Sequence, residues 1–422
     1  MKSTDECVEG INQLPSKEAA TQVIPIDVIF DILVRVPVKS LVRFKCVSKA
    51  WLSLILSALF ATTFNTRVLK NPSDRYSLLV IAKDKSTSQR HFLSAPYQSG
   101  STTQLLTLPN IPSEKTEVDI LNGLVLFHPQ NGYLKHNFAF IINPNTHEVM
   151  KLLGKAAQPR FSYGNVHICY FFGFDPSTRG FKVLNTRIIG LRTPKKRKIE
   201  CGLFDLSSCS WKRINPVFPF DIMGDDWLYW LRDNVCIDGV IYLLLHHSFL
   251  LAAFDLREES FSLIPFPQGA IPTDIVTNYD HEGRPGICFN YPYMINYNGL
   301  LAFICIEKIH HHKTVEIWIL EDPKNQEWVK ETIILPENCG GSGSQRPRNA
   351  IFTGEIMFTP KMISKECMQI PFYDMNKRCF RVIEISMPSW MASDDMEVSC
   401  FGGYVENIMR LRGMSEPLLE QI

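Results

Sequence analysis

Near the start of the chain, apolar residues recur at helical spacing between Ile24 and Ile55. Pro25 suits the first turn of a helix, because its missing N–H would have no partner there. Pro37 predicts the end of that first helix, since a proline disfavours helical geometry in the residue before it. A second short helix follows, and Ser48 can cap a third. The pattern therefore predicts a small module of three helices.

This module carries more apolar surface than a unit of its size can bury by itself. Units below about 40 residues generally need a disulfide, a metal or a partner, and this segment has one cysteine, Cys46, and no cluster of metal-binding residues. From Ile32 to Ser73 there are basic residues and no acidic ones. The basic residues are Arg35, Lys39, Arg43, Lys45, Lys49, Arg67 and Lys70. We expect a docking module for an acidic, apolar partner, with a solvated rim around an ordinary helical core as the alternative.

From about Tyr76 onward, short apolar runs alternate with turn clusters, which predicts an all-β domain. A turn glycine followed by an apolar strand recurs at a spacing of roughly 58 residues or twice that distance. These glycines are Gly123, Gly239, Gly299 and Gly354. A second recurring element has an acidic residue or an asparagine in the turn between two apolar strands, as in FGFDPSTRGFKVL. Antiparallel hairpins at this period favour one four-stranded sheet per repeat.

Sheets of this kind arranged radially form a β-propeller, and the repeats predict about six blades, with seven blades or a β-sandwich as alternatives. The expected blades lie near residues 76–108, 118–152, 166–214, 235–267, 295–335 and 351–385. A terminal strand around Val398 to Leu411 is expected to help close the ring. The fold prediction is thus a small all-α module followed by a large all-β domain.

Composition is typical of a globular protein, with 45% hydrophobic and 21% charged residues in 422. The 44 basic and 43 acidic residues nearly balance, which disfavours general binding to nucleic acid. The N-terminus lacks the pattern of a signal peptide, and the longest apolar stretch, Val240 to Phe254, is too short and too polar to span a bilayer. We expect an intracellular protein, in the nucleus, the cytoplasm or both, whose 12 scattered cysteines are free thiols.

In order, the helical module reads Ile-Pro, Ile-Leu, Val-Pro-Val-Lys-Ser-Leu, Phe-Lys-Cys-Val-Ser-Lys, then Trp and Leu-Ile. This order resembles the F-box motif. The resemblance implies binding to the acidic Skp-type adaptor of an SCF (Skp–cullin–F-box) ubiquitin ligase and, through it, to cullin and RING subunits. The positions that either contact the adaptor or hold the module's own core are Pro25, Ile29, Ile32, Leu33, Val36, Pro37, Leu41, Val47 and Trp51.

The β domain resembles the F-box-associated interaction domain of plant F-box proteins, which is kelch-like in character. FGFDPSTRGFKVL, FDLREESFSLIPFP and VEIWILED carry this resemblance, although the paired glycines of full kelch repeats are missing. The resemblance implies recognition of a target protein. The expected organisation is a disordered N-terminus over 1–23, an F-box over 24–64, a linker over 65–75, a substrate-recognition domain over 76–411 and a C-terminal tail over 412–422.

Motifs for catalysis or for cofactor binding are missing from the sequence. There is no GxxxxGK[ST] phosphate loop, no GxGxxG, no GxSxG and no HExxH. The run from His310 to His312 is the best metal candidate, but adjacent side chains on a strand point to opposite faces, so solvated loop histidines are expected. The sequence therefore predicts a protein that is not an enzyme and that takes no cofactor or metal.

Two further segments are candidates for binding. The basic run Lys195, Lys196, Arg197 and Lys198 is typical of a nuclear-import signal, with a solvated hairpin tip as the alternative. A second cluster combines carboxylates with aromatic side chains, which anchor interfaces when they are exposed. It comprises Asp225, Asp226, Trp227, Tyr229 and Trp230. A surface loop over a blade is the alternative for this cluster.

The leading hypothesis is a non-catalytic substrate receptor of a ubiquitin ligase. Its F-box would hold the adaptor, and its β domain would capture a target protein for ubiquitination and proteasomal degradation. A β-propeller enzyme is the first alternative, and it would need ionisable groups that converge on the central channel. A scaffold that does not promote degradation, or a module that recognises glycans or a ribonuclease, is the second.

Overall fold

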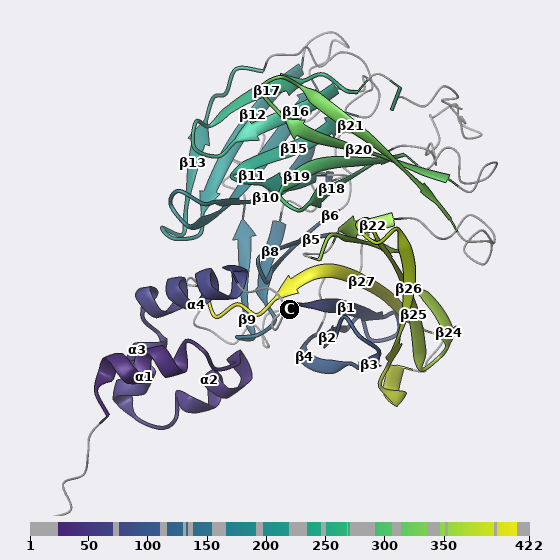
Figure 1. The fold of residues 1–422 in the computed structure, drawn as a ribbon. Coiled ribbons are helices and arrows are strands. Elements are labelled where there is room, and N and C mark those ends of the chain that lie inside the picture. Colours follow the sequence, from purple (N-terminus) through teal and green to yellow (C-terminus); the bar gives the residue numbers. More distant parts are fainter. Residues whose placement is uncertain are drawn as a thin grey trace, which may run out of the picture.

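The computed structural model describes residues 24–70, 76–109, 116–129, 132–133, 138–153, 166–190, 197–218, 234–245, 250–267, 269–270, 292–305, 314–335, 347–350, 353–391 and 395–411. Four helices come first, and a large assembly of strands follows (Figure 1). The helices are α1 (Ile26–Leu33), α2 (Val38–Phe44), α3 (Lys49–Ile55) and α4 (Ala58–Lys70).

The three predicted helices begin where the sequence indicates. Pro25 and Pro37 are the N-cap residues of α1 and α2. Ser48 caps α3, and its side chain accepts a hydrogen bond from the backbone N–H of Trp51 at 3.1 Å. Among the described residues no single helix has the length and apolar composition needed to cross a membrane. The pair α3 and α4 meets both criteria when the two helices are taken together, but the pair is bent by 58° at its junction.

α4 is one helix more than the sequence analysis predicted. Ser57 starts it, because its hydroxyl accepts a hydrogen bond from the backbone N–H of Phe60 at 3.1 Å. Phe60, Phe64 and Val68 follow at a spacing of four residues and are buried on one side of the helix. The linker expected over residues 65–75 therefore begins inside α4.

Six antiparallel sheets form the β domain. The first contains β1 (Tyr76–Asp84), β2 (Arg90–Ala95), β4 (Thr103–Leu108) and β27 (Met396–Val405). The second contains β5 (Thr116–Leu121), β6 (Leu124–Pro129), β8 (Phe138–Asn143) and β9 (Glu148–Leu153). The third contains β7 (Gly132–Tyr133), β10 (Val166–Asp175), β11 (Gly180–Gly190), β12 (Arg197–Asp205) and β13 (Ser210–Ile214).

The other three sheets follow in chain order. The fourth contains β14 (Asn234–Ile237), β15 (Val240–Leu245), β16 (Leu250–Asp255) and β17 (Ser260–Ile264). The fifth contains β18 (Tyr293–Tyr297), β19 (Leu300–Cys305), β20 (Thr314–Asp322) and β21 (Glu327–Ile334). The sixth contains β22 (Pro347–Ala350), β23 (Glu355–Phe358), β24 (Lys361–Ser364), β25 (Cys367–Asp374), β26 (Cys379–Ser386) and β3 (Gly100–Ser101). A short 3₁₀ helix, η5 (Ser389–Met391), precedes β27.

The sheets are the blades of a six-bladed propeller. The innermost strands β27, β5, β10, β14, β18 and β22 contact one another in that order, and β22 contacts β27 again. This ring of inner strands distinguishes a propeller from a β-sandwich, which has two packed layers instead. The predicted count of six blades is confirmed.

The first and last strands of the domain close the ring. β27 pairs with β1 over its whole length, from Val405 opposite Tyr76 to Met396 opposite Asp84. β3 adds a second link. It lies between β2 and β4 of the first blade in the sequence, but it pairs in parallel with β26 of the sixth blade. The predicted terminal strand around Val398 to Leu411 is therefore a strand as far as Val405. Residues 406–411 continue without regular structure.

The two faces of the propeller differ in their connections. On one face, which we call the turn face, the innermost strand of a blade turns into the second strand. Neighbouring turns contact one another there, since Gly239 lies beside Pro176 of the preceding blade and Gly354 lies beside Asn298. The opposite ends of the strands form the other face, which we call the loop face.

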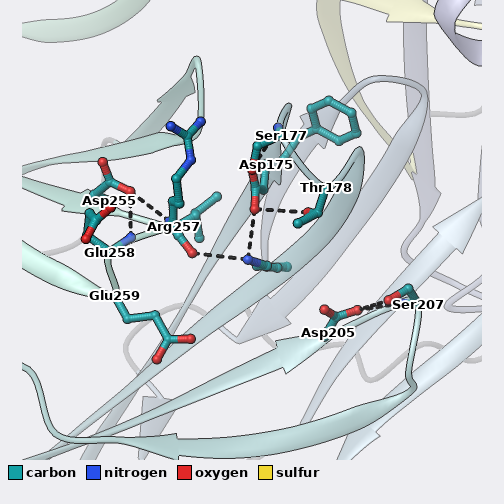
Figure 2. Close-up of polar contacts among 12 residues, drawn as sticks. Asp175, Ser177, Thr178, Asp205, Ser207, Asp255, Arg257, Glu258 and Glu259 are labelled. Atoms are coloured by element: carbon teal, nitrogen blue, oxygen red, sulfur yellow. Dashed lines mark hydrogen bonds and ion pairs between the residues drawn. The ribbon is translucent and has the colours of Figure 1, made fainter.

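Acidic turns stabilise the hairpins in the same way in blade after blade. In each turn a side-chain oxygen accepts a hydrogen bond from the backbone N–H two residues later, at distances of 2.7 to 3.0 Å. The accepting residues are Asp84, Asn143, Asp175, Asp205, Asp255, Asp322 and Asp374. Figure 2 shows three of them, at Asp175, Asp205 and Asp255. The second repeat element of the sequence therefore has a local physical cause.

One of these turns also links two blades. Lys182 donates through Nζ to Oδ2 of Asp175 at 3.0 Å and to the carbonyl oxygen of Leu256, in the next blade, at 3.1 Å. Burial alone would raise the pKa of Asp175, but hydrogen bonds from Ser177, Lys182 and Thr178 together lower it well below its usual value. The ionised carboxylate thus stabilises the contact between blades three and four.

We predict that Asp175→Asn lowers the free energy of unfolding by roughly 1–3 kcal/mol at pH 7. Because the folded-state pKa of Asp175 is lowered, its contribution is fully present above the unfolded-state pKa, about 3.9, and is lost as the pH falls through the folded-state value. Urea unfolding of both proteins at pH 7 and below pH 4 measures this. A difference that stays constant over that range would contradict the role of the carboxylate charge.

Gly123 and Gly299 offer a matched test of ring closure. Their φ angles are +83° and +85°, so an alanine costs about 1–2 kcal/mol of backbone strain at either site. At Gly123 the added Cβ would also lie 2.3 Å from the carbonyl oxygen of Val405, whereas at Gly299 it would meet nothing within 4 Å. We predict that Gly123→Ala lowers the free energy of unfolding by about 2 kcal/mol more than Gly299→Ala. Equal losses in the free energy of unfolding, measured with urea, would show that the turn at Gly123 does not pack tightly against β27.

Candidate functional site

The four helices expose an unusual amount of apolar surface. Among the described residues, eight large apolar side chains of the helical module are exposed, against seven in the much larger β domain. The eight are Ile24, Ile26, Val28, Ile32, Val42, Val47, Leu52 and Leu59. We call this set the docking surface. Apolar side chains that gather on a small, basic module are typical of an interface.

The structure separates the nine positions of the motif by burial. Pro25, Ile32, Pro37 and Val47 are exposed, and Ile29, Val36 and Trp51 are half-buried. Leu33 and Leu41 are buried, with 0% and 1% of their surface exposed. In the free protein the last two therefore hold the module's own core, and the first four are accessible to a partner.

The opposite side of the helical module packs against the propeller. One apolar cluster joins Leu33 and Leu41 to Phe60 and Phe64 of α4, and it continues into Val405 and Ile408 beyond the last blade strand. The rings of Phe30 and Phe60 meet edge to face at 5.3 Å. The module is thus seated on the turn face, where Tyr76 begins β1.

A polar network completes this seat, and its centre is Asn407, which is 1% exposed. Its Oδ1 accepts from Nδ2 of Asn65 on α4 at 3.3 Å, and its Nδ2 donates to the carbonyl oxygen of Asn122 at 2.7 Å. Its backbone N–H donates to Oδ1 of Asn145 at 3.1 Å. One asparagine therefore joins the helical module to two turns of the second blade.

Asn143, in the second blade, also binds the segment that contains Asn407. Its Nδ2 donates to the carbonyl oxygens of Asn407 at 3.1 Å and Met409 at 2.9 Å, while its Oδ1 accepts from the N–H of Asn145 at 3.0 Å. The six other turns of this type have an aspartate at this position, which can accept but cannot donate. In this one repeat an Asn stands where the other turns have an Asp. This difference is visible in the sequence but was not used to predict the contact.

A cavity of about 690 Å³ lies in the central channel. Inner strands of several blades line it, and among the described residues Asp119 is the one charged residue in the lining. Asp119 accepts hydrogen bonds from Nδ2 of Asn234 at 3.3 and 3.4 Å, and Nε2 of His128 lies 3.6 Å from its Oδ2. Within the described ranges, no three His, Cys, Asp or Glu side chains are grouped as a metal site would require.

Most of the other candidates from the sequence lie outside the described residues. These are Lys195, Lys196, Asp225, Asp226, Trp227, Tyr229, Trp230 and the histidines 310–312. Arg197 and Lys198 are the first residues of β12, which begins at the loop face. Nuclear import through the basic run and substrate binding through the aromatic cluster therefore stay predictions.

Two protein-family models match the chain in the same order as the structure. The F-box domain matches residues 22–62, and the F-box associated beta propeller domain matches residues 77–401. The chain belongs to the F-box-associated β-propeller family. The F-box implies a Skp-type adaptor as a partner, and the pairing of an F-box with a propeller supports a role in substrate recognition in general. This architecture is typical of receptors that are not catalysts.

Plant F-box proteins are similar to the chain over nearly its whole length. The F-box protein At5g65850 of Arabidopsis thaliana is 27% identical over 95% of this chain and 93% of its own. The F-box protein DOR of the same plant is 27% identical over 94% and 97%. Among solved structures, apo AztD from Citrobacter koseri aligns with a TM-score of 0.33 and 9% identity over 78% of this chain and 99% of its own. U3-55K aligns with a TM-score of 0.32 and 10% identity over 74% and 82%. These structural likenesses are too weak to carry an argument.

We predict that Asn143→Asp loosens the F-box from the propeller. The change keeps the shape of the side chain but removes two donated hydrogen bonds and places a carboxylate beside two carbonyl oxygens. The expected loss in free energy of unfolding is roughly 2–4 kcal/mol. Hydrogen exchange of the α4 amides should accelerate as well, because the seat of the helix weakens.

Asp205→Asn is the control for this variant, because it makes the opposite change in an exposed turn of the third blade. Its side chain can still accept through Oδ1, so we expect little change in stability. Similar losses in free energy of unfolding in the two variants would show that the hydrogen bonds donated by Nδ2 of Asn143 do not hold the F-box on the propeller.

Proposed function

We propose that this protein is the substrate-recognition subunit of an SCF ubiquitin ligase. Its F-box binds a Skp-type adaptor, which connects it to the cullin and RING subunits, and its propeller holds a target protein for ubiquitination and proteasomal degradation. The observation that carries the proposal is the docking surface, since the helices expose apolar side chains although the propeller already buries their other side. A partner is needed to cover that surface.

Charge supports an acidic partner at this surface. The basic residues of the segment from Ile32 to Ser73 include Arg35 and Lys39, and both are exposed beside the apolar residues of the docking surface. Complementary charge raises the association rate and disfavours partners of the same sign. An acidic, apolar adaptor fits both properties.

The chain's part in the reaction is to hold two partners in a fixed relation. The transfer of ubiquitin then occurs on other subunits, and its rate depends on the effective concentration of the target's lysines near the conjugating enzyme. A receptor of this kind needs a rigid connection between its two binding surfaces. The network around Asn407 supplies one, because it bonds to α4 and to the second blade at once.

We expect Ile32→Glu to weaken binding of a purified Skp-type adaptor at least tenfold, a loss of about 1.4 kcal/mol or more. The variant replaces an exposed apolar side chain, 51% accessible, with one that an acidic partner repels. The F-box should stay folded, because Ile32 is outside its core. Isothermal titration calorimetry with the full-length chain gives the affinities, and thermal melts check the fold.

Val382→Glu is the matched control, since Val382 is 52% exposed but lies on β26 of the propeller. It should bind the adaptor like the unchanged protein. If the unchanged, folded protein does not bind the adaptor, the proposed function is wrong. If both variants bind equally well, the docking surface is assigned to the wrong residues.

A further inference from the structure

β24 is an exposed strand on the loop face of the sixth blade. All four of its residues, Lys361 to Ser364, are exposed, with 42% of Met362 and 47% of Ile363 accessible. A strand normally buries one of its two faces, because alternate side chains point to opposite sides. Two exposed apolar residues in succession show that β24 buries neither.

The inner edge of β24 has no neighbour among the described residues. β24 pairs with β25 on its outer side, with Met362 opposite Met368. Pro360 interrupts the strand between β23 and β24, since it has no N–H to donate to a ladder. β22, the inner neighbour of β23, begins at Pro347, which is opposite Phe358 and therefore stops short of β24. The backbone groups along the inner edge of β24 thus form a row that can pair with another strand.

The cavity in the central channel extends to β24. Met362 is part of its lining, together with the methionines Met294, Met357 and Met368. Methionine side chains are flexible and polarizable, so they adapt to apolar groups of different shape. The cavity's volume of about 690 Å³ is within the usual range for ligand pockets, roughly 300–1,000 Å³. An uncharged side chain suits it, because Asp119 is the one charged residue in that part of its lining which the structure describes.

We propose that β24 and the adjoining cavity bind an extended segment of a partner protein by strand addition. The segment pairs with the inner edge of β24, and its residue opposite Met362 points to the same side as Met362, into the cavity. That residue is apolar or uncharged. An acidic residue beside it is favoured by the exposed ammonium group of Lys361.

The position of β24 assigns it to the target and not to the adaptor. β23 starts at the turn face, beside Gly354, and the chain leaves it toward the loop face, where β24 lies. Figure 1 shows β24 and the helices α1 to α3 at opposite sides of the molecule. The inference rests on the proposed function in this respect, since it identifies the target's binding mode at the far end of the receptor.

An exposed aromatic side chain lies in the connection from β26 to β27, which runs over the loop face. Trp390, in η5, is 43% exposed, and its ring lies 4.4 Å from that of His91 between centroids. The backbone N–H of Met387 donates to the carbonyl oxygen of Glu366 at 2.8 Å, which fastens the segment before η5 to the turn after β24. Exposed aromatic side chains anchor interfaces, so Trp390 is a further candidate contact on the loop face.

The test uses the full-length protein and a phage-displayed library of random 12-residue peptides. Selected peptides are synthesised, and their affinities are measured by fluorescence anisotropy. Hydrogen exchange then shows which amides they protect. We expect the β24 amides that point away from β25 to exchange quickly in the free protein and at least tenfold more slowly with a bound peptide. The selected sequences should share an uncharged or apolar residue.

Two lysine variants test the contact. Met362→Lys should weaken peptide binding at least tenfold, because it places a charge at the entrance of the cavity and at the strand edge. Val382→Lys, at a similarly exposed site on β26, should change the affinity less than twofold. Both residues are exposed, so neither variant threatens the fold.

Three results would overturn the inference. Protection, in the free protein, of the β24 amides that point away from β25 would show that another segment of the chain already covers the inner edge. Selected peptides that protect other residues instead would place the interface elsewhere. A selection without binders would show that the edge does not capture extended segments. Failure of the proposed function is distinguishable from all three, because adaptor binding is measured separately.

Discussion

The closing of the propeller by its last strand is the constraint on which the rest of the structure depends. β27 completes the first blade by pairing with β1, and the residues that follow it, 406–411, run into the seat of the F-box. Asn407 then joins α4 to the second blade through three side-chain and backbone contacts. The segment that holds the ring together therefore also holds the helices on the ring. A loss of closure would release the F-box, and it would expose apolar side chains such as Val405 and Ile408.

This connection gives the molecule two surfaces in a fixed relation. The docking surface lies on the helices, whose other side is buried on the turn face, while β24 and the mouth of the channel lie on the loop face. Helices and blades need no covalent or metal link for this purpose, because apolar packing and a network of asparagine amides hold them. Amide side chains suit such a junction, since each can donate and accept at once without introducing a charge into a buried site.

Much of this arrangement could be predicted from the sequence, because its causes are local. Turn glycines such as Gly123 adopt a positive φ, and turn aspartates such as Asp175 accept hydrogen bonds from residues close by in the chain, so the pattern of the chain shows the blades directly. The different burial of Ile32 and Leu33 could not be predicted from the motif, since the motif contains both residues and only the packing of the helices shows which one is in the core. Asn407 was missed because its partner Asn65 is far away in the chain. β24 pairs with β25, which follows it directly, but its place at the cavity in the central channel depends on strands of other blades and was missed for that reason.

The predicted linker was another place where local pattern did not suffice. Phe60, Phe64 and Val68 form a stripe of one helix, but that stripe is stable only because Val405 and Ile408 cover it. The most direct test of this arrangement is a structure of the chain bound to a Skp-type adaptor. We expect the adaptor to cover Ile32 and Val47 while Asn407 keeps its hydrogen bonds to Asn65 and Asn122. An adaptor bound on the propeller, or an F-box lifted off residues 405–411 in the complex, would contradict it.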